Sequence, residues 1–172
     1  MRGRGISGVA FVIALTVGCG GEKAASDAAD TGAAGERVAA VEVRDACSYV
    51  TKAEMETILG GSLNEPTSAP AGSGSACTYV GPTGTYAMLT VDPQGGEAAL
   101  AGTRMAGEMM DSSAGDIKST NSVAGLGDEA VMLIGGMLNV RKGAALVSVD
   151  LRGSTDPEVK GRAIVEKVLA KM

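Results

Sequence analysis

Three segments of the chain place apolar residues at the spacing of a buried helix face. The first covers residues 51–59, where Thr51 and Glu54 form a capping box and two glycines follow the last helical residue. The second covers residues 94–111, and the third opens with an Asp-Pro pair and covers residues 156–172. The faces expected to be buried comprise Ala98, Ala101, Met105 and Met109 in the second helix and Gly161, Ile164, Val165, Val168 and Met172 in the third.

Runs of apolar residues between turn-forming residues predict two groups of strands. Residues 77–80 and 85–91 form a hairpin around a turn rich in glycine. Residues 130–134, 137–141 and 144–151 form an antiparallel meander, joined by a Gly-Gly turn and a Lys-Gly turn. Each group follows one of the predicted helices along the chain.

Two segments between these elements have weaker patterns. Residues 62–75 are rich in Pro, Gly and Ser and predict a polar loop, and residues 117–123 are the candidate for one extra strand. The fold class expected is α+β, with an antiparallel sheet of about five to six strands packed by helices. The expected order along the chain is helix, hairpin, helix, meander, helix.

The first 18 residues have the pattern of a secretory signal peptide, in which Arg2 and Arg4 precede a short apolar stretch. The stretch ends in Leu15-Thr16-Val17-Gly18-Cys19. This ending resembles the lipobox of bacterial lipoproteins, although Thr16 stands where that family usually has Leu. The resemblance implies that Cys19 carries diacylglycerol, becomes the first residue after cleavage and holds the protein at a membrane. The alternative is an ordinary signal peptide with an incidental cysteine.

Residues 19–44 separate this leader from the predicted helices and strands. They are dominated by Ala, Gly, Asp and Glu, a composition that cannot bury enough apolar surface to offset the entropy of ordering. We therefore expect a flexible tether that carries the lipidated Cys19, followed by a single domain over residues 45–172. Residues 38–43 could instead begin the fold as a strand. Gly20 replaces the Asp that marks inner-membrane retention, so the expected location is the outer membrane if the cell has two membranes.

The cysteine count agrees with an exported protein. If Cys19 carries lipid, Cys47 and Cys77 remain as an even pair, 30 residues apart, and an oxidising envelope allows them to form a disulfide. The alternative is a buried pair of free thiols. A zinc site is not expected, because two cysteines in a chain without histidine cannot complete a zinc shell.

Three segments of the domain form a pattern when taken together. Residues 46–60 join a cysteine, a helix and Leu-Gly, and residues 77–79 are a cysteine followed by an aromatic residue. Residues 123–130 contain Gly-Leu-Gly-Asp-x-Ala, and a hairpin follows at residues 138–143. This order resembles a family of small bacterial envelope lipoproteins of unknown function, over about residues 45–170. The resemblance implies a disulfide-bearing α+β domain on a lipid anchor and assigns no catalytic residue.

Composition and charge exclude several functions. The 172 residues carry a net charge of −5 and include no His, no Trp and only one Phe and three Tyr. Such a chain lacks the positive charge and the stacking side chains that nucleic-acid binding uses. It also lacks the usual general base and the commonest metal ligand, so neither a metal nor a cofactor is expected.

The residues Gly125, Gly127, Asp128 and Glu129 are the most distinctive run of candidate site residues. Asp128 and Glu129 are hard oxygen ligands, so the run is either a loop for Ca²⁺ or a polar ligand, or a tight turn with glycines at positive φ. The spacing does not fit an EF-hand, and the run lacks the pattern of a phosphate-binding loop. The turn is the favoured interpretation.

Two hypotheses for the function follow. The first is a non-catalytic binding or interaction module of the cell envelope, which engages an unknown envelope protein or an apolar ligand. The methionines lie on predicted apolar faces, which favours core packing over Cu(I) binding and suggests a groove lined by Met and Ala. The second is a cryptic enzyme that uses Asp, Glu, Ser or Lys, although no motif for such chemistry is present. We favour the first hypothesis.

Overall fold

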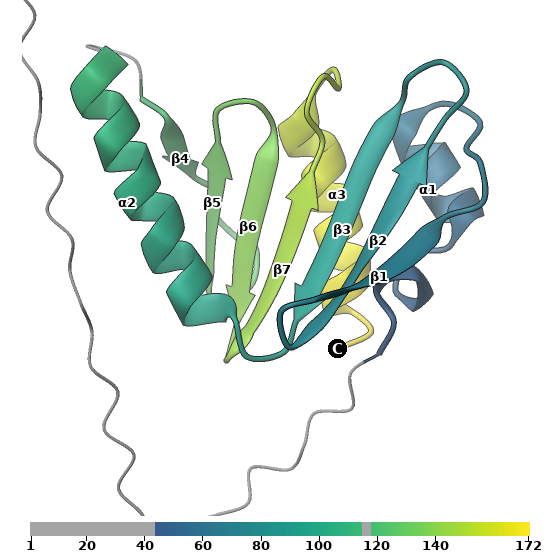
Figure 1. Ribbon diagram of the computed structural model, residues 1–172, viewed down its shortest axis with the longest axis horizontal. Helices are drawn as coiled ribbons and strands as arrows, with labels where there is room; N and C mark the ends of the chain where they lie inside the picture. The colour runs from purple at the N-terminus through teal and green to yellow at the C-terminus, as the bar shows by residue number, and fades with distance from the viewer. Residues whose placement is uncertain (1–43, 115–117) are drawn as a thin grey trace, which may run out of the picture. The chain divides into compact units, whose positions relative to one another are not determined.

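A computed structural model describes residues 44–114 and 118–172 (Figure 1). The signal peptide, Cys19, the tether up to residue 43 and the strand considered at residues 38–43 lie outside the described residues.

The centre of the fold is one antiparallel sheet of seven strands in the order β1-β2-β3-β7-β6-β5-β4 (Figure 1). The pairing of β3 with β7 joins the strands before the second long helix to those after it. The strands are β1 (Thr67–Ala71), β2 (Gly74–Val80), β3 (Tyr86–Asp92), β4 (Thr120–Ser122), β5 (Glu129–Leu133), β6 (Met137–Lys142) and β7 (Ala145–Asp150).

Helices separate and flank the strands. They are the 3₁₀-helix η1 (Ala46–Ser48) and the α-helices α1 (Lys52–Leu59), α2 (Gly96–Ala114) and α3 (Pro157–Leu169). The predicted capping box of α1 is present, and Gly60 ends this helix in the left-handed conformation. The α+β class with an antiparallel sheet is confirmed.

The predicted number and order of strands are wrong in the first half of the domain. Strand β1 lies within residues 62–75, where the sequence predicts a loop, so a three-stranded meander replaces the hairpin. β1 is an exposed edge strand of small and polar residues, and an edge is where a strand can accommodate Pro70. The extra strand considered at residues 117–123 is present as the short β4.

Helices α2 and α3 pack on opposite faces of the sheet. Successive residues of β6 show this, since neighbouring side chains of a strand point to opposite faces. Leu138 packs against Gly161 of α3, while the amide Nδ2 of Asn139 donates to Thr103 of α2 at 2.8 Å. In Figure 1, α1 and α3 lie behind the strands.

The main core fills the face that α3 and α1 cover. The predicted buried stripe of α3 is confirmed at four positions, because Gly161, Ile164, Val165 and Val168 are buried, whereas Met172 is half exposed. These side chains share one core with fully or almost fully buried residues from α1, the strands and the position that follows β7, namely Met55, Tyr79, Leu89, Leu138, Val140, Val147, Val149 and Leu151.

The predicted buried face of α2 is wrong. Gly96 and Gly107 let the helix approach the sheet, because a Cβ at Gly96 would lie 2.6 Å from the carbonyl oxygen of Ala145. This close contact turns a face of Gly96, Leu100, Thr103 and Gly107 inward. The face that the apolar pattern assigned to the core comprises Ala98, Ala101, Met105 and Met109, and all four side chains are exposed. The exposed fraction is 63% for Met105 and 67% for Met109.

A buried hydrogen bond anchors α2 to the sheet, and it supports a stability prediction. Thr103 Oγ1 donates to the carbonyl of Ala99 at 2.8 Å and accepts the bond from Asn139. Thr103→Val removes the acceptor and leaves a buried amide donor unpaired, so we expect the free energy of unfolding to fall by about 1–3 kcal/mol. Thr103→Ser keeps the hydroxyl and serves as the control in urea denaturation. Equal stability of the two variants would contradict this role for the hydroxyl.

A second prediction concerns Glu54, which joins α1 to α3. Its carboxylate accepts from the backbone of Thr51 at 2.9 Å and from Lys167 Nζ at 3.0 Å. The Thr51 backbone bond first, and then Lys167, lower the pKa of Glu54 to about 2 from an ordinary value of 4.5. Because the folded-state pKa is the lower one, this stabilisation is complete above pH 4.5 and is lost as the pH falls towards 2.

Glu54→Gln tests this assignment, since glutamine keeps a capping oxygen but carries no charge. We expect the variant to be less stable by about 1 kcal/mol at neutral pH, with the difference shrinking as the pH falls below 4.5. Urea denaturation of both proteins across this pH range measures the effect. A stability difference that is the same at every pH would show that the charge of Glu54 contributes nothing.

Candidate functional site

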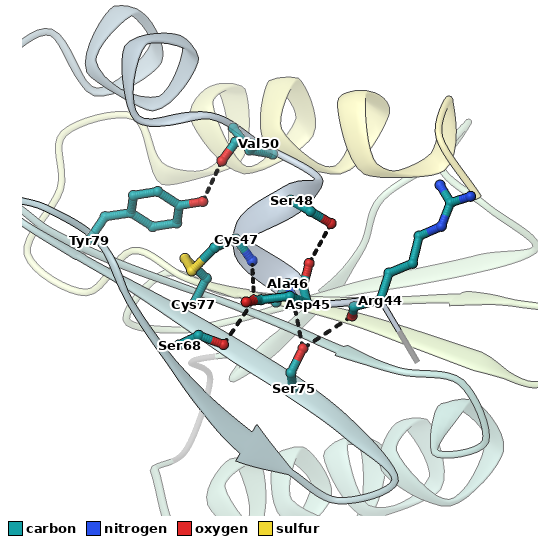
Figure 2. The surroundings of a disulfide bond; sticks show 10 residues. All are labelled: Arg44, Asp45, Ala46, Cys47, Ser48, Val50, Ser68, Ser75, Cys77 and Tyr79. Atoms are coloured by element: carbon teal, nitrogen blue, oxygen red, sulfur yellow. Dashed lines mark hydrogen bonds between the residues drawn. A yellow bond between two sulfur atoms is a disulfide. The ribbon is translucent and has the colours of Figure 1, made fainter. Parts of the chain in front are cut away.

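The predicted disulfide between Cys47 and Cys77 is present and joins η1 to the central part of β2 (Figure 2). The two Cα atoms are 5.0 Å apart, and Cys77 is fully buried. The bond therefore fastens the beginning of the described chain to β2, the second strand from one edge of the sheet.

Polar groups around the disulfide hold the same segment in place (Figure 2). Asp45 accepts from the backbone of Cys47 at 2.9 Å and from the hydroxyl of Ser68 at 2.8 Å. The phenol of Tyr79 donates to the carbonyl of Val50 at 2.6 Å. Burial, supported by nearby carboxylates, raises the pKa of Tyr79 to about 12, so the phenol stays protonated as a donor. These contacts hold η1 and the start of α1 against β1 and β2.

The candidate motif around Asp128 forms a turn that leads into β5. Gly125 and Gly127 have φ values of 79° and 57°, as a tight turn with left-handed positions requires. The carboxylate of Asp128 accepts from the backbone of Gly143 at 2.6 Å, and its own backbone N–H donates to Arg141 at 2.8 Å. The Gly143 bond is the main cause of a lowered pKa for Asp128. The two contacts tie this turn to the end of β6 and to the β6–β7 turn.

The fourth residue of the motif, Glu129, lies in a cleft that sequence reasoning missed. A cavity of about 500 Å³ lies between α2, the start of β5 and the β6–β7 turn. We call it the α2 cleft. The side chains that give it its chemical character are Glu97, Leu100, Ala101, Arg104, Glu129 and Arg141.

The α2 cleft carries charges of both signs. Glu129 forms an ion pair with Arg104 and lies 3.9 Å from Arg141, whose guanidinium is also 3.7 Å from Asp128. Glu97 adds a second carboxylate from the first turn of α2. Buried Leu100 and the small Ala101 provide an apolar surface between these groups. Guanidinium N–H groups that these ion pairs leave unused can donate to a carboxylate, and Glu97, which takes part in none of the ion pairs of the described residues, can accept from an ammonium group.

The cleft is not visible in the sequence because its partners are brought together by the fold. Arg104 and Glu129 are 25 residues apart, and the orientation of α2 that places Arg104 beside β5 depends on the glycine contacts described above. Met105, Met109 and Met110 are exposed on α2, so the expectation that they pack in the core is wrong.

Two further properties concern metal and membrane binding. Within residues 44–114 and 118–172, no three side chains of the types His, Cys, Asp or Glu are grouped closely enough to hold a metal ion. Among the helices that the structure describes, none has both the length and the apolar character to cross a membrane.

Comparison of the chain with protein-family models, with curated proteins and with solved structures found no match.

Proposed function

We propose that the chain is an exported lipoprotein whose folded domain, residues 45–172, is a non-catalytic binding module of the cell envelope. Diacylglycerol on Cys19 would anchor it, and residues 20–44 would tether the domain. The disulfide between Cys47 and Cys77 supports export, because such bonds persist in oxidising compartments and are rare in the cytosol. The N-terminal segment, in which Arg2 and Arg4 precede an apolar stretch, also supports export.

The α2 cleft is the observation that carries the binding role. Its arginines and glutamates face a small apolar surface within about 500 Å³, the size of a small-molecule site. The ligand that fits this pattern is a small zwitterion with a short aliphatic part, such as an amino acid or a short peptide. Its carboxylate would meet Arg104 and Arg141, its ammonium group would meet Glu97, and its aliphatic part would contact Leu100.

Filling the cleft from α2 tests this proposal. Ala101 lines the cleft and is exposed, so Ala101→Leu should occupy ligand space while leaving the core unchanged. Ala106→Leu adds the same atoms to an exposed position outside the cleft lining and is the matched control. Native mass spectrometry of the protein from the cell envelope, with alanyl-alanine added as a probe, measures occupancy.

We expect the wild type and Ala106→Leu to carry a non-covalent ligand, either a molecule that copurifies from the envelope or the added dipeptide. We expect Ala101→Leu to carry neither. An adduct that survives Ala101→Leu unchanged would place binding elsewhere on the protein. A protein that shows neither adduct nor dipeptide binding would contradict the role proposed for the α2 cleft.

A further inference from the structure

A second cavity lies beside the segment that connects β7 to α3. It measures about 300 Å³ and is formed by the β2–β3 turn, the connection between β7 and α3, and the end of α1. We call it the β7–α3 pocket. It shares no lining residue with the α2 cleft.

The β7–α3 pocket is lined by cations and hydroxyl groups. Arg152 and Lys160 are its charged side chains, and no carboxylate contributes to its lining. This contrasts with the whole chain, which carries a net charge of −5. The hydroxyl groups belong to Thr83, Thr85, Tyr86, Ser154 and Thr155.

Lys160 contributes a charge that no described carboxylate neutralises. Its Nζ donates to the hydroxyls of Ser154 and Thr155, each at 3.2 Å. Among the ion pairs of the described residues, none involves Lys160. An ammonium group has three N–H donors, so two are held by hydroxyls and one remains for a ligand.

Arg152 is held in a fixed orientation by a buried partner. Its Nε donates to Asp150 at 2.8 Å, and its Nη2 lies 2.6 Å from the same carboxylate, which is only 1% exposed. This pair neutralises one positive charge, so the net charge that the pocket offers a ligand comes from Lys160. The Nη1 amino group of Arg152 takes no part in the pair with Asp150 and can donate to a ligand.

The first turn of α3 begins beside the pocket, between Thr155 and Lys160. Asp156 precedes the helix with a φ of 53°, and its side chain does not cap the backbone N–H groups of that turn. Asp156 and Glu158 are both exposed and outside the pocket lining. Helix starts favour anions, which adds to the preference set by Lys160 and Arg152.

We propose that the β7–α3 pocket binds a phosphate ester that carries free hydroxyl groups. A phosphate group accepts hydrogen bonds in several directions, which suits an ammonium group, a guanidinium edge and hydroxyls that surround one space. The threonine and serine hydroxyls both donate and accept, so they can also bind the hydroxyls of a polyol. This proposal does not depend on the α2 cleft or on the lipid anchor.

The phosphate could belong to a soluble ester or to a lipid headgroup, and two probes separate these sources. The full chain with Cys19→Ser, produced by export, avoids membrane attachment through the anchor. Isothermal titration with glycerol 1-phosphate tests the soluble source. Sedimentation with vesicles of equal parts phosphatidylglycerol and phosphatidylcholine, against phosphatidylcholine alone, tests the headgroup.

Lys160→Gln is the decisive variant, because it removes the unpaired charge and leaves the Arg152–Asp150 pair intact. We expect it to weaken binding of the active probe by about tenfold or more. Lys52→Gln is the matched control, since Lys52 lies on α1, outside the lining, and has only the exposed Glu65 as partner at 3.7 Å. Thr155→Val should weaken the same binding without changing the charge.

Binding of either probe that falls in Lys160→Gln and Thr155→Val but not in Lys52→Gln supports the proposal and identifies the source. Absence of binding to both probes would overturn it. Binding that Lys160→Gln and Lys52→Gln weaken equally would also overturn it, because only the overall charge would then matter.

Discussion

Replacing Cys47 and Cys77 together by alanine is expected to lower the free energy of unfolding by about 3–4 kcal/mol. The bond closes a loop of 30 residues, and without it the unfolded chain gains the entropy of that loop. Loss of the bond should also loosen the packing of the core, because the bond holds η1, and η1 packs against β2 and β3. A loss of this size corresponds to a fall in melting temperature of roughly 10–20 °C.

Thermal and urea denaturation of the oxidised protein and the double variant measure this effect. Reduction of the wild type by dithiothreitol should reproduce most of it, since it opens the bond without removing the sulfur atoms. Cys19→Ser is the control, because Cys19 lies outside the disulfide. Equal stability of the oxidised and reduced wild type would show that the bond contributes nothing to the fold.

Gly127→Ala is expected to have the second largest effect, about 3 kcal/mol or more of lost stability. Gly127 has a φ of 57°, where a side chain is strained, and a Cβ there would overlap the carbonyl oxygen of Arg141 and lie 2.8 Å from Val140 Cγ1. The backbone of Arg141 and the buried side chain of Val140 are both held by the sheet, so neither can move away from an added methyl group. The clash would push the turn away from β6 and displace Glu129 from the α2 cleft.

Gly125→Ala separates strain from clash in the same turn. Gly125 has a φ of 79°, but the nearest atom to an added Cβ would be Arg162 Nη1 at 3.9 Å. We therefore expect a loss of only about 1 kcal/mol, which arises from the backbone conformation alone. Denaturation curves of the two variants measured side by side decide the point. If Gly127→Ala is no less stable than Gly125→Ala, the close approach to Arg141 is not a constraint.

The elements that could be predicted from the sequence are those that depend on local rules. The capping box at Thr51, the glycine at position 60 and the turns of the β5–β7 meander each involve residues close together in the chain. The disulfide could be predicted because, if Cys19 is set aside for a lipid, Cys47 and Cys77 are the remaining pair of cysteines.

The features that were missed lack an apolar pattern or depend on contacts between distant residues. Strand β1 is polar and exposed and pairs with the neighbouring β2 across a two-residue turn, so no alternation of apolar residues marks it as a strand. Helix α2 has apolar residues on two sides, and the backbone approach allowed by Gly96 and Gly107 decides which side is buried. The α2 cleft follows from that choice, which is why the motif at Asp128 was visible in the sequence but its neighbour Arg104 was not.

Intact-mass spectrometry of the protein extracted from cell membranes tests both the lipid anchor and the disulfide in one sample. We expect a chain that begins at Cys19, carries diacylglycerol on that residue and is two hydrogens lighter than the reduced protein. Peptide mapping should place the bond between Cys47 and Cys77. A protein without lipid on Cys19, or one with both other thiols free, would contradict an exported and lipid-anchored binding module.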